Sequence, residues 1–460
     1  MWVIDILFLW GTHEKSEKVR KWLESWKMDP LFLSTIFIIV VGLVAAVMDA
    51  GAVRAMFMAT IALSPVWLPL FLVVFLWVSW VDYVRLLFWF SQGTVLLEVQ
   101  LPPEVTKSPV AMETFLTTLH NTGGEGTFVD RFWLGKYRPV WALEIASNGG
   151  KIGFYIHLRK AWRNIVEARL YGLFPEAKVT EVDDYAAKLP FNLTEYDMWG
   201  AEFNKLGPQA LPIKSYIDYG LDRDPKEEFK IDPIANILEL LASISEGEYF
   251  WMQIILKGHR GESEWYGIKT AGDDAFKKGA TAEIEKSMAD AAKRAQKVID
   301  EYKIEQGRMV TMTKNEQLRI EQIERSMAKL VFDCGVRVLY IAKKEKFNGI
   351  NIGATVNFFG AFRGQDTTRE YNNIMPTRGV SIFDYAWQDF HDIRHRILKR
   401  NLFFQYKHRA YFYVPYDQVP VYLTTEELAT LWHFPSSGIV TPGLNRVSSR
   451  RSEAPLNLPI

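Results

Sequence analysis

Two histidines one helical turn apart, His391 and His395, are the residues of this chain whose spacing is closest to that of a catalytic metal site. Histidines at i and i+4 lie on one face of a helix, and zinc proteases bind their metal through such a pair. Here Asp392 stands where those enzymes carry the general-base glutamate. Arg394 and Arg396 would also place positive charge beside a dication. We therefore expect exposed helix histidines without a metal, and we keep a zinc metalloprotease as the less favoured alternative.

A glycine-containing stretch, Gly261–Thr270, has some features of a phosphate-binding loop. That motif needs four residues between its outer glycines and a lysine directly after the second one, because the backbone amides and the lysine enclose the phosphates. Here five residues separate Gly261 from Gly267, and Ile268 stands before Lys269. The chain has one cysteine, which excludes thiolate zinc sites and disulfide frameworks. We expect no cofactor and no enzymatic activity.

A basic and aromatic run follows the histidines, between residues 393 and 410, with no acidic residue inside it. Its cations alternate with Phe403, Phe404 and Tyr406, a mixture that can contact phosphates while the rings stack on bases. The same run can lie against anionic lipid, or it can form a helix face paired with acids elsewhere in a chain of net charge zero. The candidate contacts to nucleic acid or lipid are Arg394, Arg396, Lys399, Arg400, Lys407 and Arg409.

The elements that position these residues begin with two apolar segments. Leu31–Met48 is uncharged over 18 residues, about 27 Å as a helix, which matches the hydrocarbon thickness of a bilayer. A second uncharged run, Ala55–Val81, contains a Ser-Pro helix start at 64–65. We predict an amphipathic interfacial segment at residues 1–28 and a two-span transmembrane helical hairpin at 29–91.

Basic residues concentrate before the first predicted span, whereas Arg54 is the one cation in the loop between the spans. The positive-inside rule therefore places the N-terminus in the cytoplasm, and a two-span hairpin returns the rest of the chain to the same side. We expect a protein of the cell (inner) membrane with cytoplasmic soluble domains.

After Gly93 the hydrophobic pattern becomes that of a globular α+β protein. Residues 92–205 have the element order βαββαβ, with an Asn-Gly-Gly hairpin turn at 148–150, and this order is that of a ferredoxin-like α/β-plait. A second plait is predicted at residues 206–422, beginning with a strand at Ile213–Tyr216.

The second plait is predicted to carry a long helical insertion at residues 261–329. Thr313 and Glu316 form a capping-box pattern that starts the second of its two helices. Charges of both signs alternate along the insertion, which is typical of a solvated helical hairpin. A paddle that docks a partner is the other interpretation of the same pattern.

The C-terminal region reads LTTEELATLWHFP at Leu423–Pro435 and EAPLNLP at 453–459. Together with the block Val310–Tyr340 and the NFFGAFR segment at 357–363, it resembles the membrane-anchored N-terminal region of bacterial conjugation and type IV secretion coupling ATPases of the TraG/HerA/FtsK-like kind. The resemblance covers most of residues 92–460. In such proteins a nucleotide-binding domain follows the proline-rich end, and here the sequence stops without one. The resemblance therefore implies a separately encoded HerA/TraG-like ATPase as partner.

We expect residues 423–460, a short helix and an extended tail, to dock that ATPase. The partner-docking candidates are Glu426, Glu427, Leu428, Leu431, Trp432 and His433. The sequence thus favours a non-enzymatic accessory subunit that seats the ATPase at the cytoplasmic membrane, as an oligomer matching the motor, with nucleic acid as a further candidate partner. A membrane scaffold unrelated to DNA transfer is the alternative.

Overall fold

The computed structural model describes residues 50–102, 107–223, 231–265, 268–271, 274–302, 312–364, 370–380, 389–435, 443–444 and 446. The predicted interfacial segment and the first predicted span lie outside these residues, as does most of the C-terminal tail. The chain divides into two compact units. One comprises Met1–Trp80 with Ser381–Ile397; the other, here called the sheet unit, comprises Val81–Val380 with Leu398–Ile460.

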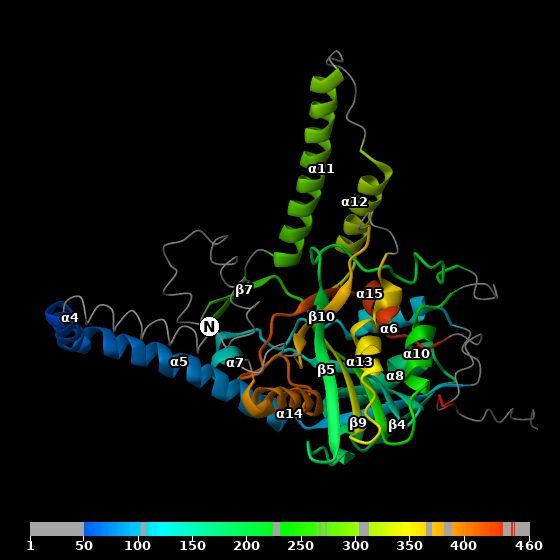
Figure 1. Cartoon of the computed structure of the whole chain (residues 1–460), viewed down its shortest axis with the longest axis horizontal. Helices are drawn as coiled ribbons and strands as arrows, with labels where there is room; N and C mark the ends of the chain where they lie inside the picture. The colour runs from blue at the N-terminus through cyan, green and yellow to red at the C-terminus, as the bar shows by residue number, and fades with distance from the viewer. Residues whose placement is uncertain are drawn as a thin grey trace, which may run out of the picture. The chain divides into compact units, whose positions relative to one another are not determined.

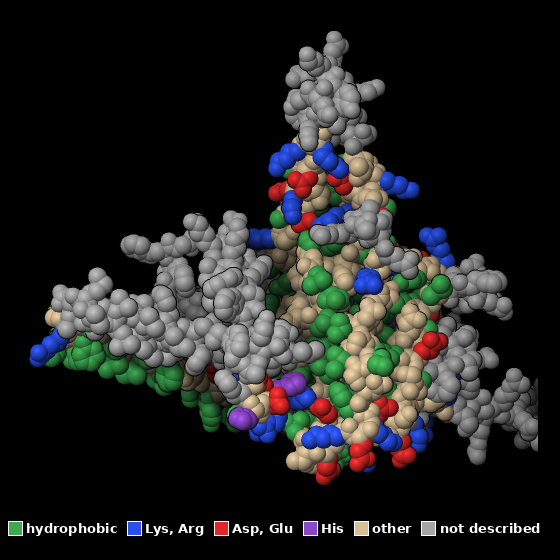
Figure 2. Space-filling model, viewed as in Figure 1, with side chains coloured by type: hydrophobic (Ala, Val, Ile, Leu, Met, Phe, Trp, Pro, Cys, Tyr) green, Lys and Arg blue, Asp and Glu red, His purple; other side chains and the backbone are tan. Residues whose placement is uncertain are grey.

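The first unit contains helix α4 (Ala50–Ala62) and most of helix α5 (Ser64–Ser91). Helix α5 begins at the predicted Ser-Pro start, and it is the one helix among the described residues long and apolar enough to cross a membrane. Its large apolar side chains are exposed, among them Leu70 at 66% and Leu76 at 68%. Figure 2 shows these hydrophobic side chains gathered along the helix. A membrane-spanning role is consistent with this surface.

The last part of α5 belongs to the sheet unit, where Val81 and Val84 are buried. Gly135 has a φ of +58° and approaches this helix so closely that a Cβ atom would lie 2.1 Å from the Val84 carbonyl oxygen. Only glycine fits such a contact without strain. Trp89 adds aromatic packing against Tyr137, with ring centroids 6.1 Å apart. The end of α5 is therefore fixed to the folded body.

The sheet unit has an α+β fold, as predicted, built on a mostly antiparallel nine-stranded sheet (Figure 1). The strands are β1 (Thr94–Gln100), β2 (Val140–Asn148), β3 (Lys151–Arg159), β4 (Lys178–Val182), β5 (Tyr196–Lys205), β6 (Glu248–Gly258), β9 (Val331–Lys343), β10 (Ile374–Gly379) and β11 (Val421–Thr424). Their order is β10-β5-β9-β6-β2-β3-β1-β4, with β11 also paired to β9. Strands β2 and β6 join the two halves, so a single core extends across the unit.

Helices cover both faces of this sheet. One face carries α6 (Pro109–Leu119), α8 (Arg163–Leu173), α10 (Ile234–Ala242), α13 (Ile350–Val356) and α15 (Thr425–Leu431). Because side chains alternate along a strand, Glu144 of β2 lies on the face opposite Leu143 and contacts the segment after α14 (Ile393–Lys407). The short helices α7 (Phe128–Phe132) and α9 (Tyr185–Lys188) lie in connections.

Two local expectations are corrected by the structure. The predicted strand at Ile213–Tyr216 is an irregular segment that leads into a turn at Tyr216. Its amides do not pair with a strand: Ile213 N donates to Glu427 Oε1 at 3.0 Å, and Tyr216 N donates to Thr430 Oγ1 at 2.9 Å. Strand β5, which the sequence analysis did not identify, lies between β10 and β9. Strand β5 lies within residues 92–205, the predicted first plait, yet it pairs with β9 and β10 in the second half of the sheet.

The insertion forms two helices that stand side by side, α11 (Ala275–Tyr302) and α12 (Lys314–Met327) (Figure 1). The predicted capping box at the start of α12 is confirmed. Arg294 pairs with Glu316 at 2.5 Å, which joins the two helices above their shared apolar base. The stretch considered as a phosphate loop instead contains a small hairpin of β7 (Glu262–Trp265) and β8 (Ile268–Ala271).

Candidate functional site

The six residues expected to dock a partner are all buried. Exposed fractions are 3% for Glu426, 0% for Glu427, Leu428, Leu431 and Trp432, and 1% for His433. The Trp432 ring packs edge-on against Phe154, and its Nε1 donates to the Glu144 carbonyl at 3.3 Å. The expectation of an exposed docking face on α15 is therefore wrong, because the helix is a core element.

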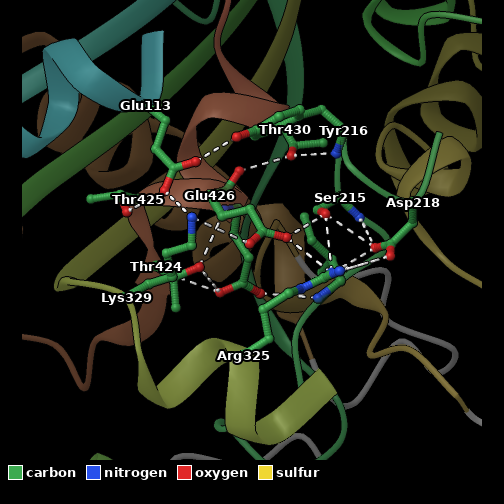
Figure 3. A network of polar contacts seen from close by, with 12 residues as sticks. Glu113, Ser215, Tyr216, Asp218, Arg325, Lys329, Thr424, Thr425, Glu426 and Thr430 are labelled. Atoms are coloured by element: carbon green, nitrogen blue, oxygen red, sulfur yellow. Dashed lines mark hydrogen bonds and ion pairs between the residues drawn. The ribbon is translucent and has the colours of Figure 1, made fainter. Parts of the chain in front are cut away.

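Both buried glutamates of α15 contact basic groups from distant segments, and Figure 3 shows the contacts of Glu426. Glu427 closes the capping box with Thr424 and pairs with Lys205 at 2.8 Å. Glu426 accepts from Ser215 Oγ at 2.5 Å and pairs with Arg325 at 3.0 Å. Burial raises the pKa of Glu426, and the Ser215 hydrogen bond and the nearby Arg325 only partly oppose this.

Glu113 of α6 extends the same network. Its carboxylate accepts from Tyr216 OH at 2.5 Å and from Thr425 Oγ1 at 3.1 Å, and it pairs with Lys329 at 2.6 Å. Burial and the Glu113 hydrogen bond both raise the pKa of Tyr216. His433 lies two residues beyond the end of α15, with its Nδ1 2.9 Å from the Ala429 carbonyl oxygen. Such a closed network joins separate segments and stabilises the fold.

The predicted basic surface between residues 393 and 410 is not continuous. Arg409 is 4% exposed and bonds Glu144 through Nε at 2.9 Å and Nη2 at 3.0 Å. Lys399 forms an ion pair with Asp197, and Tyr406 is buried. Arg400 is exposed and Lys407 half-buried in the sheet unit, whereas Arg394 and Arg396 belong to the other unit. Two of the six candidates, Lys399 and Arg409, are therefore engaged in ion pairs within the protein, and nucleic-acid or lipid contact by the other four stays a prediction.

The histidine pair also does not form the expected helical arrangement. His391 has a φ of 58°, outside the helix, and α14 starts only at Ile393. The carboxylate of Asp389 accepts from the backbone amides of Arg394 at 2.9 Å and His395 at 2.8 Å, in the first turn of α14. Within the described part of the chain, no group of three or more His, Cys, Asp or Glu side chains is placed to hold a metal.

The structure forms a pocket that sequence reasoning missed, here called the cationic pocket. It is a cavity of about 370 Å³ in the sheet unit. It is lined by Arg85, Tyr137, Arg138, Lys257, His259, Arg260, Asp333, Phe412, Asp417, Gln418, Val419, Pro420 and Tyr422. Five of these side chains are basic and two are acidic. A cavity with this excess of basic groups favours an anionic ligand.

Strands β6 and β9, with the segments before β2 and after α14, position the charged groups. His259 follows β6, and its Nδ1 lies 2.6 Å from Asp333 Oδ1 of β9, while its Nε2 lies 3.2 Å from Asp274 Oδ1. Lys257 Nζ donates to Tyr137 OH at 2.8 Å and lies 3.6 Å from Asp333 Oδ2. The Lys257 ammonium also lies 4.4 Å from the centroid of the Phe412 ring.

These contacts shift three ionisation equilibria. Burial opposes protonation of His259, but the hydrogen bond to Asp333 and the charges of Asp333 and Asp274 outweigh it and raise its pKa. Burial would raise the pKa of Asp333, but His259 and Lys257 lower it overall. Burial lowers the pKa of Lys257, and Asp333 only partly opposes this. Within the pocket, His259 and Asp333 therefore each favour the charged form of the other side chain.

One sequence signal could have indicated this pocket, the Lys-Gly-His-Arg run at 257–260, which begins in the last two residues of β6. The other basic and acidic groups come from Arg85, Arg138, Asp333 and Asp417, which are far apart in the sequence. No spacing rule connects such positions, so only the antiparallel pairing of β6 with β9 and β2 brings them together.

Comparison with known proteins adds a family to this description. No curated protein matches the chain. A family profile described as Domain of unknown function (DUF8128) matches residues 91–446, which is more than three quarters of the 460 residues. The matched segment holds every strand of the sheet and all of the cationic pocket except Arg85. The chain therefore belongs to the DUF8128 family.

Proposed function

We propose that this protein is a membrane-anchored, non-enzymatic platform at the cytoplasmic membrane that seats a partner ATPase of the HerA/TraG-like kind. The observation that carries the anchor is the exposed apolar surface of α5 in a helix whose end is packed into a folded body. A monomeric protein rarely leaves such a surface in water, whereas the hydrocarbon of a bilayer solvates it. In this proposal the segment Leu31–Met48 supplies the first span of a hairpin, and the sheet unit is cytoplasmic.

We further propose that the sheet consists of two ferredoxin-like units joined edge to edge at β2 and β6. In each half, four strands and two helices follow the order βαββαβ. The strand orders β4-β1-β3-β2 and β10-β5-β9-β6 are equivalent, since the first strand of each half lies between its fourth and third. This repetition supports the assignment, with α11 and α12 inserted between the second and third strands of the later unit.

Cysteine labelling of full-length protein in sealed membrane vesicles tests the anchor. The native Cys334 is 0% exposed and gives little background. Leu70→Cys lies on α5 at a position 66% exposed, and Ile350→Cys is a control at a position 80% exposed on the sheet unit. We expect a membrane-impermeant maleimide, added to the face that bears the sheet unit, to label Ile350→Cys rapidly and Leu70→Cys only after detergent is added. Equal labelling rates in intact membranes would refute the anchor.

The partner contact is assigned to α11 and α12 in place of α15, because α15 is buried and the insertion carries exposed charged and apolar side chains (Figure 2). Met288 of α11 is 51% exposed, and Lys293 on the same helix is also exposed. Met288→Glu with Lys293→Glu should weaken capture of a co-expressed HerA/TraG-like ATPase at least tenfold, while Ile350→Glu leaves capture unchanged. Capture that the double variant leaves intact would contradict this assignment, and absence of any capture would favour a scaffold unrelated to DNA transfer.

A further inference from the structure

The cationic pocket has the size and charge of a site for a phosphate group. Its volume of about 370 Å³ falls within the usual range for small-ligand pockets, roughly 300–1,000 Å³. Arginine and lysine are the side chains that most often bind phosphate, through charge-assisted hydrogen bonds. With Glu125 beside Arg138 and Asp274 beside His259 included, the five basic groups of the lining face four acidic ones.

Lys257 provides the buried donor that such a site needs. Its side chain is 7% exposed and carries three N–H groups. The Tyr137 hydroxyl accepts a hydrogen bond from one of these N–H groups, with 2.8 Å between the oxygen and Lys257 Nζ. Asp333 Oδ2 lies 3.6 Å from Lys257 Nζ, beyond hydrogen-bond distance. Asp333 is already engaged by His259 at 2.6 Å. Donor capacity of the Lys257 ammonium is therefore left for an anion in the cavity it lines.

The position of Arg85 indicates where that anion comes from. Arg85 lies on α5, four residues after the uncharged run ends at Val81, which is about 6 Å along the helix axis. That distance beyond the hydrocarbon boundary is the depth of lipid phosphates. Basic side chains just cytoplasmic of a span are attracted to anionic headgroups.

We propose that the cationic pocket binds the phosphate group of an anionic phospholipid, an inference that rests on the proposed insertion of α5. Lys257 and Arg138 hold the phosphate from the floor of the pocket, while Arg85 and Arg260 contact it from the rim. The lipid fixes the end of α5 and the sheet unit at one depth of the membrane. Tyr137 and Phe412 supply aromatic walls of the pocket.

The test uses the full chain purified in uncharged maltoside micelles. Dioctanoyl phosphatidylglycerol is the probe, with dioctanoyl phosphatidylcholine and inorganic phosphate as comparators, and binding is followed by calorimetry and by native mass spectrometry. We expect one saturable site for phosphatidylglycerol, with at least tenfold weaker binding of each comparator. Each rim cation should contribute about fivefold, the equivalent of about 1 kcal/mol, so Arg85→Gln with Arg260→Gln weakens binding about 25-fold.

A matched control is Arg169→Gln with Arg378→Gln, two exposed arginines outside the pocket, which should bind as the wild type does. Lys257→Met tests the floor, and its melting temperature shows whether a loss of binding reflects unfolding. Equal binding of inorganic phosphate would overturn the lipid assignment, as would equal binding of phosphatidylcholine or unchanged binding by the rim variant. The Leu70→Cys labelling experiment decides membrane insertion separately, so a failure of the pocket proposal is distinguishable from a failure of the anchor.

Discussion

Replacement of Arg409 by methionine tests whether this residue is a surface contact or an internal ion pair. Its guanidinium is 4% exposed and donates twice to the Glu144 carboxylate, at 2.9 and 3.0 Å, with Asp184 as a further partner. Burial would lower the pKa of Arg409, but Glu144 and Asp184 raise it well above its usual value. Arg409→Met leaves the fully buried Glu144 carboxylate with only neutral donors from Tyr185 at 2.8 Å and Gln253 at 2.8 Å.

Removing one partner of a buried ion pair costs about 3–5 kcal/mol. At about 2.1 cal/mol/K per residue, a unit of about 360 residues has an unfolding entropy near 0.76 kcal/mol/K. The melting temperature of the sheet unit should therefore fall by about 4–7 °C in Arg409→Met. Adding Glu144→Gln removes the uncompensated charge, so the double variant should regain about half of that loss.

Near-ultraviolet circular dichroism of the full chain in micelles, measured during heating, provides the assay. Arg400→Met is the matched control, because Arg400 is exposed on α14, the helix that ends just before Arg409. The melting temperature of this variant should stay within about 1 °C of the wild type. The reasoning would be refuted by an Arg409→Met protein that melts like the wild type and loses binding to single-stranded nucleic acid. A double variant less stable than the single one would also contradict the ion-pair account.

Three further outcomes follow from the structure. Trp432→Ala should destabilise the sheet unit by about 3–5 kcal/mol in thermal unfolding, because the ring is fully buried; a normal melting temperature would restore a surface role. The pKa of His259 is raised in the folded protein, so its contribution to stability is complete below the unfolded pKa of about 6.5. This contribution is lost as the pH rises through the folded pKa. The pKa of Asp333 is lowered, so its contribution to stability changes only at acidic pH. Unfolding free energies between pH 5.5 and 8.5 should therefore fall more steeply with pH in the wild type than in His259→Gln, and parallel curves would exclude the effect. Gly135→Ala places a methyl group 2.1 Å from the Val84 oxygen at a left-handed backbone position, so proteolysis should cut the end of α5 faster than in wild type, and an unchanged rate would show that the contact relaxes.

Local features could be predicted from the sequence because they depend on neighbours along the chain. The Asn-Gly-Gly turn at 148–150 joins β2 and β3 as expected, since both glycines adopt the positive φ that the turn requires. The apolar spacing of α10 and the capping box at Thr313 likewise specify helices by themselves. The composition of α5 marks it as apolar along its length without any tertiary information.

The sheet order and the burial of α15 were decided by contacts between distant segments. A short helix with Glu426 and Glu427 in its first turn has the pattern of an exposed amphipathic element, because carboxylates are rarely buried. In the folded chain, Lys205 and Arg325 arrive from other elements and neutralise these acids, so the helix can enter the core. Nothing in the local sequence specifies that pairing.

The same distinction separates the predicted sites from the one that the fold assembles. The basic residues after position 393 are close together in the sequence. Arg409 nevertheless points into the protein, because Glu144 of β2 lies on that face of the sheet and accepts its hydrogen bond. The residues that line the cationic pocket are far apart in the sequence. They meet because β6 and β9 pair in a register that places Lys257 opposite Asp333. The sequence determined which side chains carry charge, and the antiparallel register decided which charges meet, because strand pairing joins residues that no local pattern connects.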